Sequence, residues 1–131
     1  MNIGEKNVFK IYKLDSKTDE RGSLLEVLRS DKIPNIIAQI NILYSKAGSV
    51  RGKHYHKLKT EWFFVIRGEA LLRLTDLETK ESLQFHLSDG EKFLVEVKPF
   101  TYHELESIID SSILVISDRC FTNEEPDTYS Y

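Results

Sequence analysis

Short segments with alternating polar and apolar residues, separated by turn residues, are the feature that most constrains the fold of this chain. Residues two apart lie on the same face of a strand, so the alternation gives each segment one face for a core. The segments run roughly 5 to 8 residues, the usual length of strands, and are rich in β-branched and aromatic residues. They are residues 36–45, 61–68, 69–77, 82–87, 91–97 and 111–117. The pattern predicts an all-β sandwich or barrel.

Turn chemistry supports this prediction. Residues 67–68, 76–80 and 89–90 have the composition of hairpin connections. Only residues 24–29 could form a helical turn, and the polar tail 122–131 is expected to be irregular. With 131 residues the chain is too short for two ordinary domains, so we expect a single domain spanning residues 1–131.

Composition excludes several classes of function. Hydrophobic residues make up 40% of the chain and charged residues 30%, the balance of a soluble globular protein. The net charge of -3 provides no basic surface for nucleic acid. The sequence contains neither a long apolar run nor an apolar N-terminal signal, and its lone Cys120 cannot close an internal disulfide. We therefore predict a cytoplasmic protein that binds a small molecule or a second copy of itself, and not a membrane.

Four residues suggest a metal site. His54 and His56 are two apart and are expected to point to one face, Glu61 begins the next predicted strand, and His103 follows later in the chain. Three imidazoles and a carboxylate suit zinc, iron, nickel or manganese. A single histidine such as His86 is more often a surface or hydrogen-bonded residue. A same-face pair with a nearby carboxylate is harder to explain that way, because uncompensated buried polar groups are costly.

These residues resemble the motifs of the cupins. The first cupin motif is a glycine, a His-x-His pair, a glutamate and a second glycine, and its spacing is matched at Gly48, His54, His56, Glu61 and Gly68. The second motif is matched in order at Gly90, Pro99 and His103, with Thr101 in place of the usual glycine. The resemblance implies a single-domain cupin, a double-stranded β-helix with jelly-roll topology.

A narrower resemblance concerns activity. Residues 49–56, SVRGKHYH, resemble the Arg-Gly-x-His-Tyr stretch of the dTDP-4-dehydrorhamnose 3,5-epimerase family, although His56 replaces its usual glutamine. The resemblance implies that His54 is the catalytic base and that Tyr102 or Tyr44 is a candidate for the catalytic tyrosine. It also implies a set of substrate-binding residues, which are Arg21 and Glu26 for the nucleotide, Gln39 and Asn41 for the sugar, and Arg51 for the sugar or diphosphate.

The chain is also similar to the C-terminal cupin domain of capsular polysaccharide enzymes that act on UDP-4-keto sugars. The shared features are RGxHYHxxxTE, a VIxGEA strand and a terminal Pro-Asp-Thr-Tyr, here residues 51–61, 65–70 and 126–129. Nucleotide-sugar 3,4-ketoisomerases share the His-x-His pair. This similarity implies a divalent metal, with zinc expected at His54, His56, Glu61 and His103; a metal-free site is the alternative.

The resemblances imply an isomerase that epimerises C3, C5 or both in a dTDP- or UDP-linked 4-keto-6-deoxy sugar, for surface polysaccharide biosynthesis. A ketone at C4 acidifies the protons on C3 and C5, so a base can remove one and an acid can return it. Histidine suits this chemistry near neutral pH, but His54 cannot bind a metal and accept a proton at once. The alternatives are a 3,4-ketoisomerase, a metal-dependent cupin oxygenase and a non-catalytic sugar-binding cupin. Open sheet edges predict a homodimer in each case.

Overall fold

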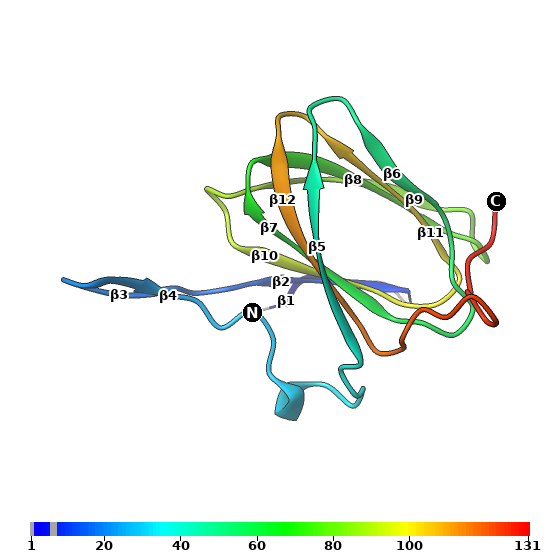
Figure 1. Ribbon diagram of the computed structural model, residues 1–131, viewed down its shortest axis with the longest axis horizontal. Coiled ribbons are helices and arrows are strands. Elements are labelled where there is room, and N and C mark those ends of the chain that lie inside the picture. Colours follow the sequence, from blue (N-terminus) through cyan, green and yellow to red (C-terminus); the bar gives the residue numbers. More distant parts are fainter. Residues whose placement is uncertain (1, 6–7) are drawn as a thin grey trace.

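Two antiparallel sheets face each other and form the body of the molecule (Figure 1). The computed structural model describes residues 2–5 and 8–131, with side chains from residue 8 onward. The six-stranded sheet has the order β1-β2-β10-β7-β12-β5 and the four-stranded sheet the order β6-β11-β8-β9. The strands of the larger sheet are β1 (Asn2–Glu5), β2 (Phe9–Lys13), β5 (Gln39–Ser45), β7 (Glu61–Arg67), β10 (Phe93–Val97) and β12 (Ser111–Ser117). Those of the smaller sheet are β6 (Val50–His54), β8 (Glu69–Asp76), β9 (Ser82–Ser88) and β11 (Thr101–Ser107).

The main core lies between the two sheets, where the inward residues of each strand meet. Along β8 and β11 buried and half-buried residues alternate, as a two-sheet barrel with one wet face requires. Its buried side chains include Phe63, Val65, Leu72, Leu74, Leu87, Val95, Leu105 and Ile113. Their burial closes the middle of the barrel and leaves one end free for polar side chains.

A second apolar cluster covers the outer face of the larger sheet. Trp62, Phe64, Leu94 and Ile116 are buried there, although they point away from the barrel interior. The segment that covers them follows the hairpin β3 (Lys17–Asp19) and β4 (Gly22–Leu24), includes the 3-10 helix η1 (Ser30–Lys32), and contributes Leu25, Val27, Leu28, Ile33 and Ile37. This packing explains why β7 is apolar on both faces. The β3–β4 hairpin itself projects from the barrel (Figure 1), and its side chains are exposed.

The prediction of an all-β barrel is confirmed, and each of the six predicted segments contains a strand. The six predicted segments leave out β1, β2, β3, β4, β6 and β11, although His54 and His56 were expected to lie on a strand. The predicted helical turn at residues 24–29 is wrong, because residues 25–29 form no regular element and the only helical residues nearby are those of η1. Over the described ranges, no helix has the length and apolarity needed to cross a membrane.

Candidate functional site

A local irregularity in β6 turns His54 toward the barrel interior. Gly52 and Lys53 both have positive φ, at 88° and 59°, and the pairing with β11 shifts register at this point. A Cβ atom on Gly52 would lie 2.8 Å from the carbonyl oxygen of His103, so only glycine allows the two strands to come this close. His54 is paired directly with His103 across the strands. Such bulges re-aim side chains next to functional sites in many sheets.

Three histidines converge at this end of the barrel. One ring nitrogen from each of His54, His56 and His103 lies within 4.8 Å of the others. The ring centroids of His54 are 4.8 Å from those of both His56 and His103. His56 and His103 are buried, whereas His54 is partly exposed. The structure therefore brings the predicted histidines together, although β6 ends at His54 and His56 lies in the following loop.

Glu61 completes the cluster. Its Oε1 atom lies 2.9 Å from Nε2 of His56 and 3.4 Å from Nε2 of His103. The opposite ring nitrogens donate to backbone carbonyls, Nδ1 of His56 to Asp127 at 2.6 Å and Nδ1 of His103 to Thr101 at 3.2 Å. Carbonyl acceptors on Nδ1 orient both rings so that Nε2 faces the common centre. This arrangement is the one that metal-binding histidines use, so the residues fit a divalent metal.

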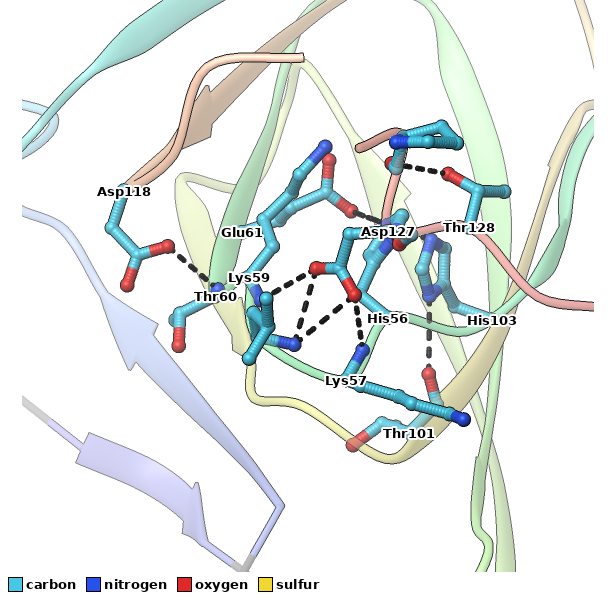
Figure 2. A network of polar contacts seen from close by, with 12 residues as sticks. His56, Lys57, Lys59, Thr60, Glu61, Thr101, His103, Asp118, Asp127 and Thr128 are labelled. Carbon is cyan, nitrogen blue, oxygen red and sulfur yellow. Dashed lines mark hydrogen bonds and ion pairs between the residues drawn. The ribbon is translucent and has the colours of Figure 1, made fainter. Parts of the chain in front are cut away.

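Two carboxylates hold the loop between His56 and Glu61. Asp127 accepts hydrogen bonds from the backbone N–H groups of residues 57, 58 and 59, and Asp118 accepts one from residue 60 (Figure 2). Asp118 also accepts a hydrogen bond from the side-chain amide of Asn35. Four consecutive amides outside regular structure are thereby satisfied. Residues far away in the sequence therefore hold the conformation of the loop that joins His56 to Glu61.

Burial and mutual repulsion determine the protonation of the rings. Burial, followed by the charges of His103 and His56, lowers the pKa of His54 to about 4. Burial also lowers the pKa of His103. Burial acts to lower the pKa of His56 too, but its hydrogen bond and attraction to Glu61 raise it above the ordinary value. For Glu61, burial acts to raise the pKa, but the hydrogen bond from His56 and the charge of His103 lower it. The cluster therefore holds an ionised carboxylate beside His56, and His54 is neutral at pH 7.

A pocket of about 200 Å³ opens onto the cluster. Its polar lining comes from Arg51, His54, Glu61 and His103, and its apolar lining from Leu43, Phe63 and Leu105. Pockets for drug-sized ligands are roughly 300 to 1,000 Å³. This pocket therefore has room for one part of a nucleotide sugar, and a larger ligand would extend over the rim of the barrel.

Three of the predicted substrate-binding residues lie at this end of the barrel or along the strand beside it. Arg51 lines the pocket, and its Nε atom donates to the hydroxyl of Ser45 at 2.8 Å. Gln39 and Asn41 lie on β5 four and two residues from Leu43, hence on the face that Leu43 turns to the pocket. The amide of Gln39 donates to Asn41 at 3.3 Å.

The other predicted residues lie elsewhere in this chain. Arg21 is at the tip of the exposed β3–β4 hairpin, where it forms an ion pair with Asp19. Glu26 lines a separate groove on the outer face of the larger sheet. Tyr102 is adjacent to His103 on β11 and so points to the opposite face, where its hydroxyl lies 2.8 Å from Glu104. The expectation that Tyr102 is a catalytic residue of the histidine site is therefore not supported by its position.

Two residues near the site escaped the sequence interpretation. Lys59 is buried, and its positive charge adds to the effect of burial, which is the main cause of the lowered pKa values of His54 and His103. Asp127 is also buried and anchors the loop that carries His56. No local sequence pattern indicates that Lys59, between His56 and Glu61, or Asp127, in a polar tail, belongs to the site. The shared Pro-Asp-Thr-Tyr segment was the one available signal for Asp127.

The fold and the histidine pocket define a cupin barrel of the kind found in sugar-nucleotide epimerases, and comparison with known proteins agrees. Residues 17–129 match the family described as the polysaccharide biosynthesis C-terminal domain, and the chain belongs to this family. A curated relative from Pseudomonas aeruginosa, a UDP-2-acetamido-2,6-beta-L-arabino-hexul-4-ose reductase, is 30% identical over 122 residues. The match covers 91% of this chain but only 32% of that relative, so the chain spans about a third of its length.

Solved structures share the fold. A dTDP-4-dehydrorhamnose 3,5-epimerase from Sulfolobus tokodaii aligns with a TM-score of 0.85 and 23% identity, over 98% of this chain and 79% of its own. A 3,4-ketoisomerase from Helicobacter canadensis aligns with a TM-score of 0.81 and 22% identity, over 94% and 90%. The capsular polysaccharide assembling protein CapF from Staphylococcus aureus aligns with a TM-score of 0.67 and 26% identity, over 91% and 34%. The predicted likeness to these three groups and the predicted cupin fold are confirmed.

We predict that the site takes up one zinc ion per chain and that protons compete with it. Histidines bind metals in the neutral form, so zinc must compete with the proton that the raised pKa favours on His56, whereas His54 is already neutral at pH 7. Affinity should therefore fall as the pH is lowered through the range in which His56 is protonated, and zinc binding in that range should release protons. Calorimetric titration with zinc in two buffers of different ionisation enthalpy measures both quantities.

The matched variants are His103→Ala, which should abolish uptake, and His86→Ala, an exposed histidine on β9 that should leave it unchanged. A wild-type protein that binds no zinc, or a His103→Ala protein that binds it normally, would contradict the assignment.

Proposed function

We propose that this chain is a nucleotide-sugar isomerase that epimerises C3, C5 or both in a dTDP- or UDP-linked 4-keto-6-deoxy sugar, in the synthesis of a surface polysaccharide. The observation that carries the proposal is the pocket itself, in which His54, Glu61 and His103 share a cavity with Arg51. A titratable cluster and a guanidinium in one pocket place groups for proton or metal chemistry beside a group for anion binding. Membership of a polysaccharide biosynthesis family and the epimerase-like fold support the substrate class.

The size of the pocket suggests how such a substrate would bind. A volume of about 200 Å³ accommodates the sugar, and the diphosphate and nucleoside would lie along the rim. Arg51 is suited to the diphosphate, because its bond to Ser45 uses one of five N–H donors and leaves four for oxygen atoms of the ligand. Gln39 and Asn41 on β5 would then face the sugar hydroxyls. The apolar wall of Phe63 and Leu105 excludes water from one side of the ring.

His54 is the histidine that a substrate can reach, because it is the least buried of the three. As a base it would remove the proton on C3 or C5 from one face, and an acid on the other side of the ring would deliver a solvent-derived proton to the opposite face. A pKa of about 4 makes this imidazole a weak base at neutral pH, since catalytic bases work best with a pKa near the operating pH. The same pKa suits a metal ligand, because no proton competes for the lone pair. The lowered pKa therefore favours the ligand role over the base role.

We propose zinc as the metal, held by His54, His56 and His103 with Glu61 beside them. A zinc ion would supply Lewis acidity toward the C4 carbonyl, which acidifies the neighbouring C–H bonds. The chain's own contribution is to orient the sugar between Arg51 and the apolar wall, and to keep the rings in position through Thr101 and Asp127.

Incubation with dTDP- and UDP-4-keto-6-deoxy sugars in deuterated water tests the reaction. We expect deuterium at C3, at C5 or at both, followed by NMR, because removal and return of a proton exchanges it with solvent. His54→Asn should abolish exchange whether His54 acts as base or as ligand, whereas His86→Asn should not affect it.

The position of exchange distinguishes the candidate activities. Inversion with retention of the C4 ketone identifies an epimerase, whereas exchange at C3 with transfer of the ketone to C3 identifies a ketoisomerase. Lack of exchange at both carbons across the set of substrates would rule out both isomerase activities and favour a sugar-binding protein.

Substitution of Arg51 tests substrate binding. We expect Arg51→Lys to raise the dissociation constant for a dTDP- or UDP-sugar about tenfold, because a point charge replaces a two-pronged donor. The matched control is Arg73→Lys on the outer face of β8, where the guanidinium pairs with Glu104 and Glu106. Calorimetry measures affinity, and thermal unfolding verifies that both variants are folded. Equal affinities for wild type and Arg51→Lys would remove Arg51 from the site.

We also propose that the chain acts as a homodimer. β5 lies at the edge of the larger sheet, and its outward residues Ile40, Ile42 and Tyr44 are 59%, 45% and 74% exposed. An apolar row on an unpaired edge strand is a typical association surface. The projecting β3–β4 hairpin is marginal in isolation and would gain stability by packing against a second copy. In that arrangement Arg21 and Glu26 would contribute nucleotide contacts to the neighbouring subunit.

Ile42→Asp tests this association. A charge in the middle of the apolar row should weaken the dimer at least tenfold, because desolvating a carboxylate at an interface is unfavourable. Ile108→Asp is the control, since Ile108 has a similar exposure of 42% but lies in the turn between β11 and β12. Light scattering at micromolar concentration measures the mass. A monomeric wild type, or an Ile42→Asp protein as dimeric as wild type, would contradict the proposal.

A further inference from the structure

Asp127 makes two kinds of contact with the histidine site at once. Its carboxylate accepts hydrogen bonds from three successive backbone N–H groups, of Lys57 at 2.8 Å, Leu58 at 3.1 Å and Lys59 at 3.0 Å. Its carbonyl oxygen accepts a hydrogen bond from Nδ1 of His56 at 2.6 Å. Asp127 is 5% exposed, and Figure 2 shows its carboxylate enclosed by this loop. Asp127 therefore holds both the ring of His56 and the loop that follows it.

The backbone conformation of Asp127 makes this double contact possible. Its φ is 51°, in the left-handed region that aspartate and asparagine tolerate better than most residues. Loss of the carboxylate would remove the interactions that offset this unfavourable conformation. The carbonyl oxygen would then no longer be held against the ring of His56.

The hydrogen bond to the carbonyl determines which nitrogen of His56 is available. A carbonyl oxygen only accepts, so Nδ1 carries a proton whether or not Nε2 also carries one, and Nε2 is directed to Glu61 and the centre of the cluster. Without this acceptor the ring could rotate or adopt the other tautomer, and Nε2 would no longer be reserved for a metal. Partners of this kind on metal-binding histidines commonly contribute 10- to 100-fold to metal affinity.

The residues after Asp127 hold it in place. Tyr129 forms a two-way backbone pairing with Tyr55, with both N–H to O distances at 3.0 Å. The ammonium of Lys57 lies 4.2 Å above the ring of Tyr129. The tail is thus bound to its own barrel on both sides of His56, and the family match extends over this segment to residue 129.

We propose that Asp127 is a positioning residue for the metal site, which acts through His56 by fixing the Nδ1–H tautomer and ring orientation. The proposal rests on the proposed metal site. The effect of Asp127 on the orientation and protonation of the His56 ring, however, can be tested without metal. It adds a residue about 70 positions away in the sequence to a site otherwise built from the barrel strands and the His56–Glu61 loop.

Two variants and a neighbouring control test the role. Asp127→Ala should weaken zinc or cobalt binding 10- to 100-fold, measured by competition with a chromophoric chelator. Asp127→Asn tolerates the left-handed conformation and keeps one acceptor oxygen, so it should fold and lose about threefold to tenfold. Glu124→Ala, an exposed residue of the same tail, should bind metal like the wild type. Thermal unfolding of the metal-free proteins reports on folding.

Nitrogen-15 NMR of the histidine rings in the metal-free protein separates positioning from mere stabilisation. The wild-type spectrum should show Nδ1 of His56 protonated and hydrogen-bonded, and both Asp127 variants should shift this resonance while leaving that of His86 unchanged. If Asp127→Ala does not fold, Asp127→Asn decides the result. Unchanged His56 resonances together with metal affinity equal to that of Glu124→Ala would overturn the proposal. A wild-type protein that binds no metal would refute the metal site. The NMR result would then still show whether Asp127 positions the ring of His56.

Discussion

Burial of two imidazoles, with a third half-buried beside them, at one end of an apolar barrel is the constraint on which this structure depends. A buried polar group without a partner costs roughly 1 to 3 kcal/mol, so the chain must bring acceptors to this point. They come from three separate segments, with Glu61 at the start of β7, Thr101 at the start of β11 and Asp127 in the tail. The site therefore forms only when the barrel has closed and the tail has docked. The contacts that satisfy the buried rings are therefore also the contacts that position the site.

Much of the site was predictable because the cupin motif relates His54, His56, Glu61 and His103 by their spacing. Strand alternation alone does not explain why the histidines converge, since β6 ends at His54 and His56 lies in the following loop. Alternation along β11 bears on Tyr102 as well. Adjacent residues on a strand face opposite sides, and a histidine at 103 that points inward turns residue 102 outward. The catalytic role expected for Tyr102 comes from the family resemblance alone and stays a prediction that its position does not support.

The remaining features depend on contacts between distant parts of the chain. The tail has no periodicity, yet Asp127 is buried because it satisfies amides about 70 residues away. Residues 24–29 suggested a helical turn, but Leu25, Val27 and Leu28 spread over the outer face of β7 and β10, where an extended chain covers more of Trp62 and Leu94. In both cases burial in the folded protein determines the local conformation, and local propensity alone does not predict it.

The electrostatics of the cluster bear on what it can do. Burial, followed by the charges of His103 and His56, opposes protonation of His54, so this ring remains neutral down to a pH of about 4. Once His56 has given up its proton, neutral rings beside the ionised Glu61 would form a set of ligands that a divalent cation complements. The burial that makes His54 a good ligand also makes it a weak base. If the rings hold a metal, the proton of the substrate must pass to a group outside the three imidazoles, and the candidates lie along the rim of the pocket or on a second copy of the chain.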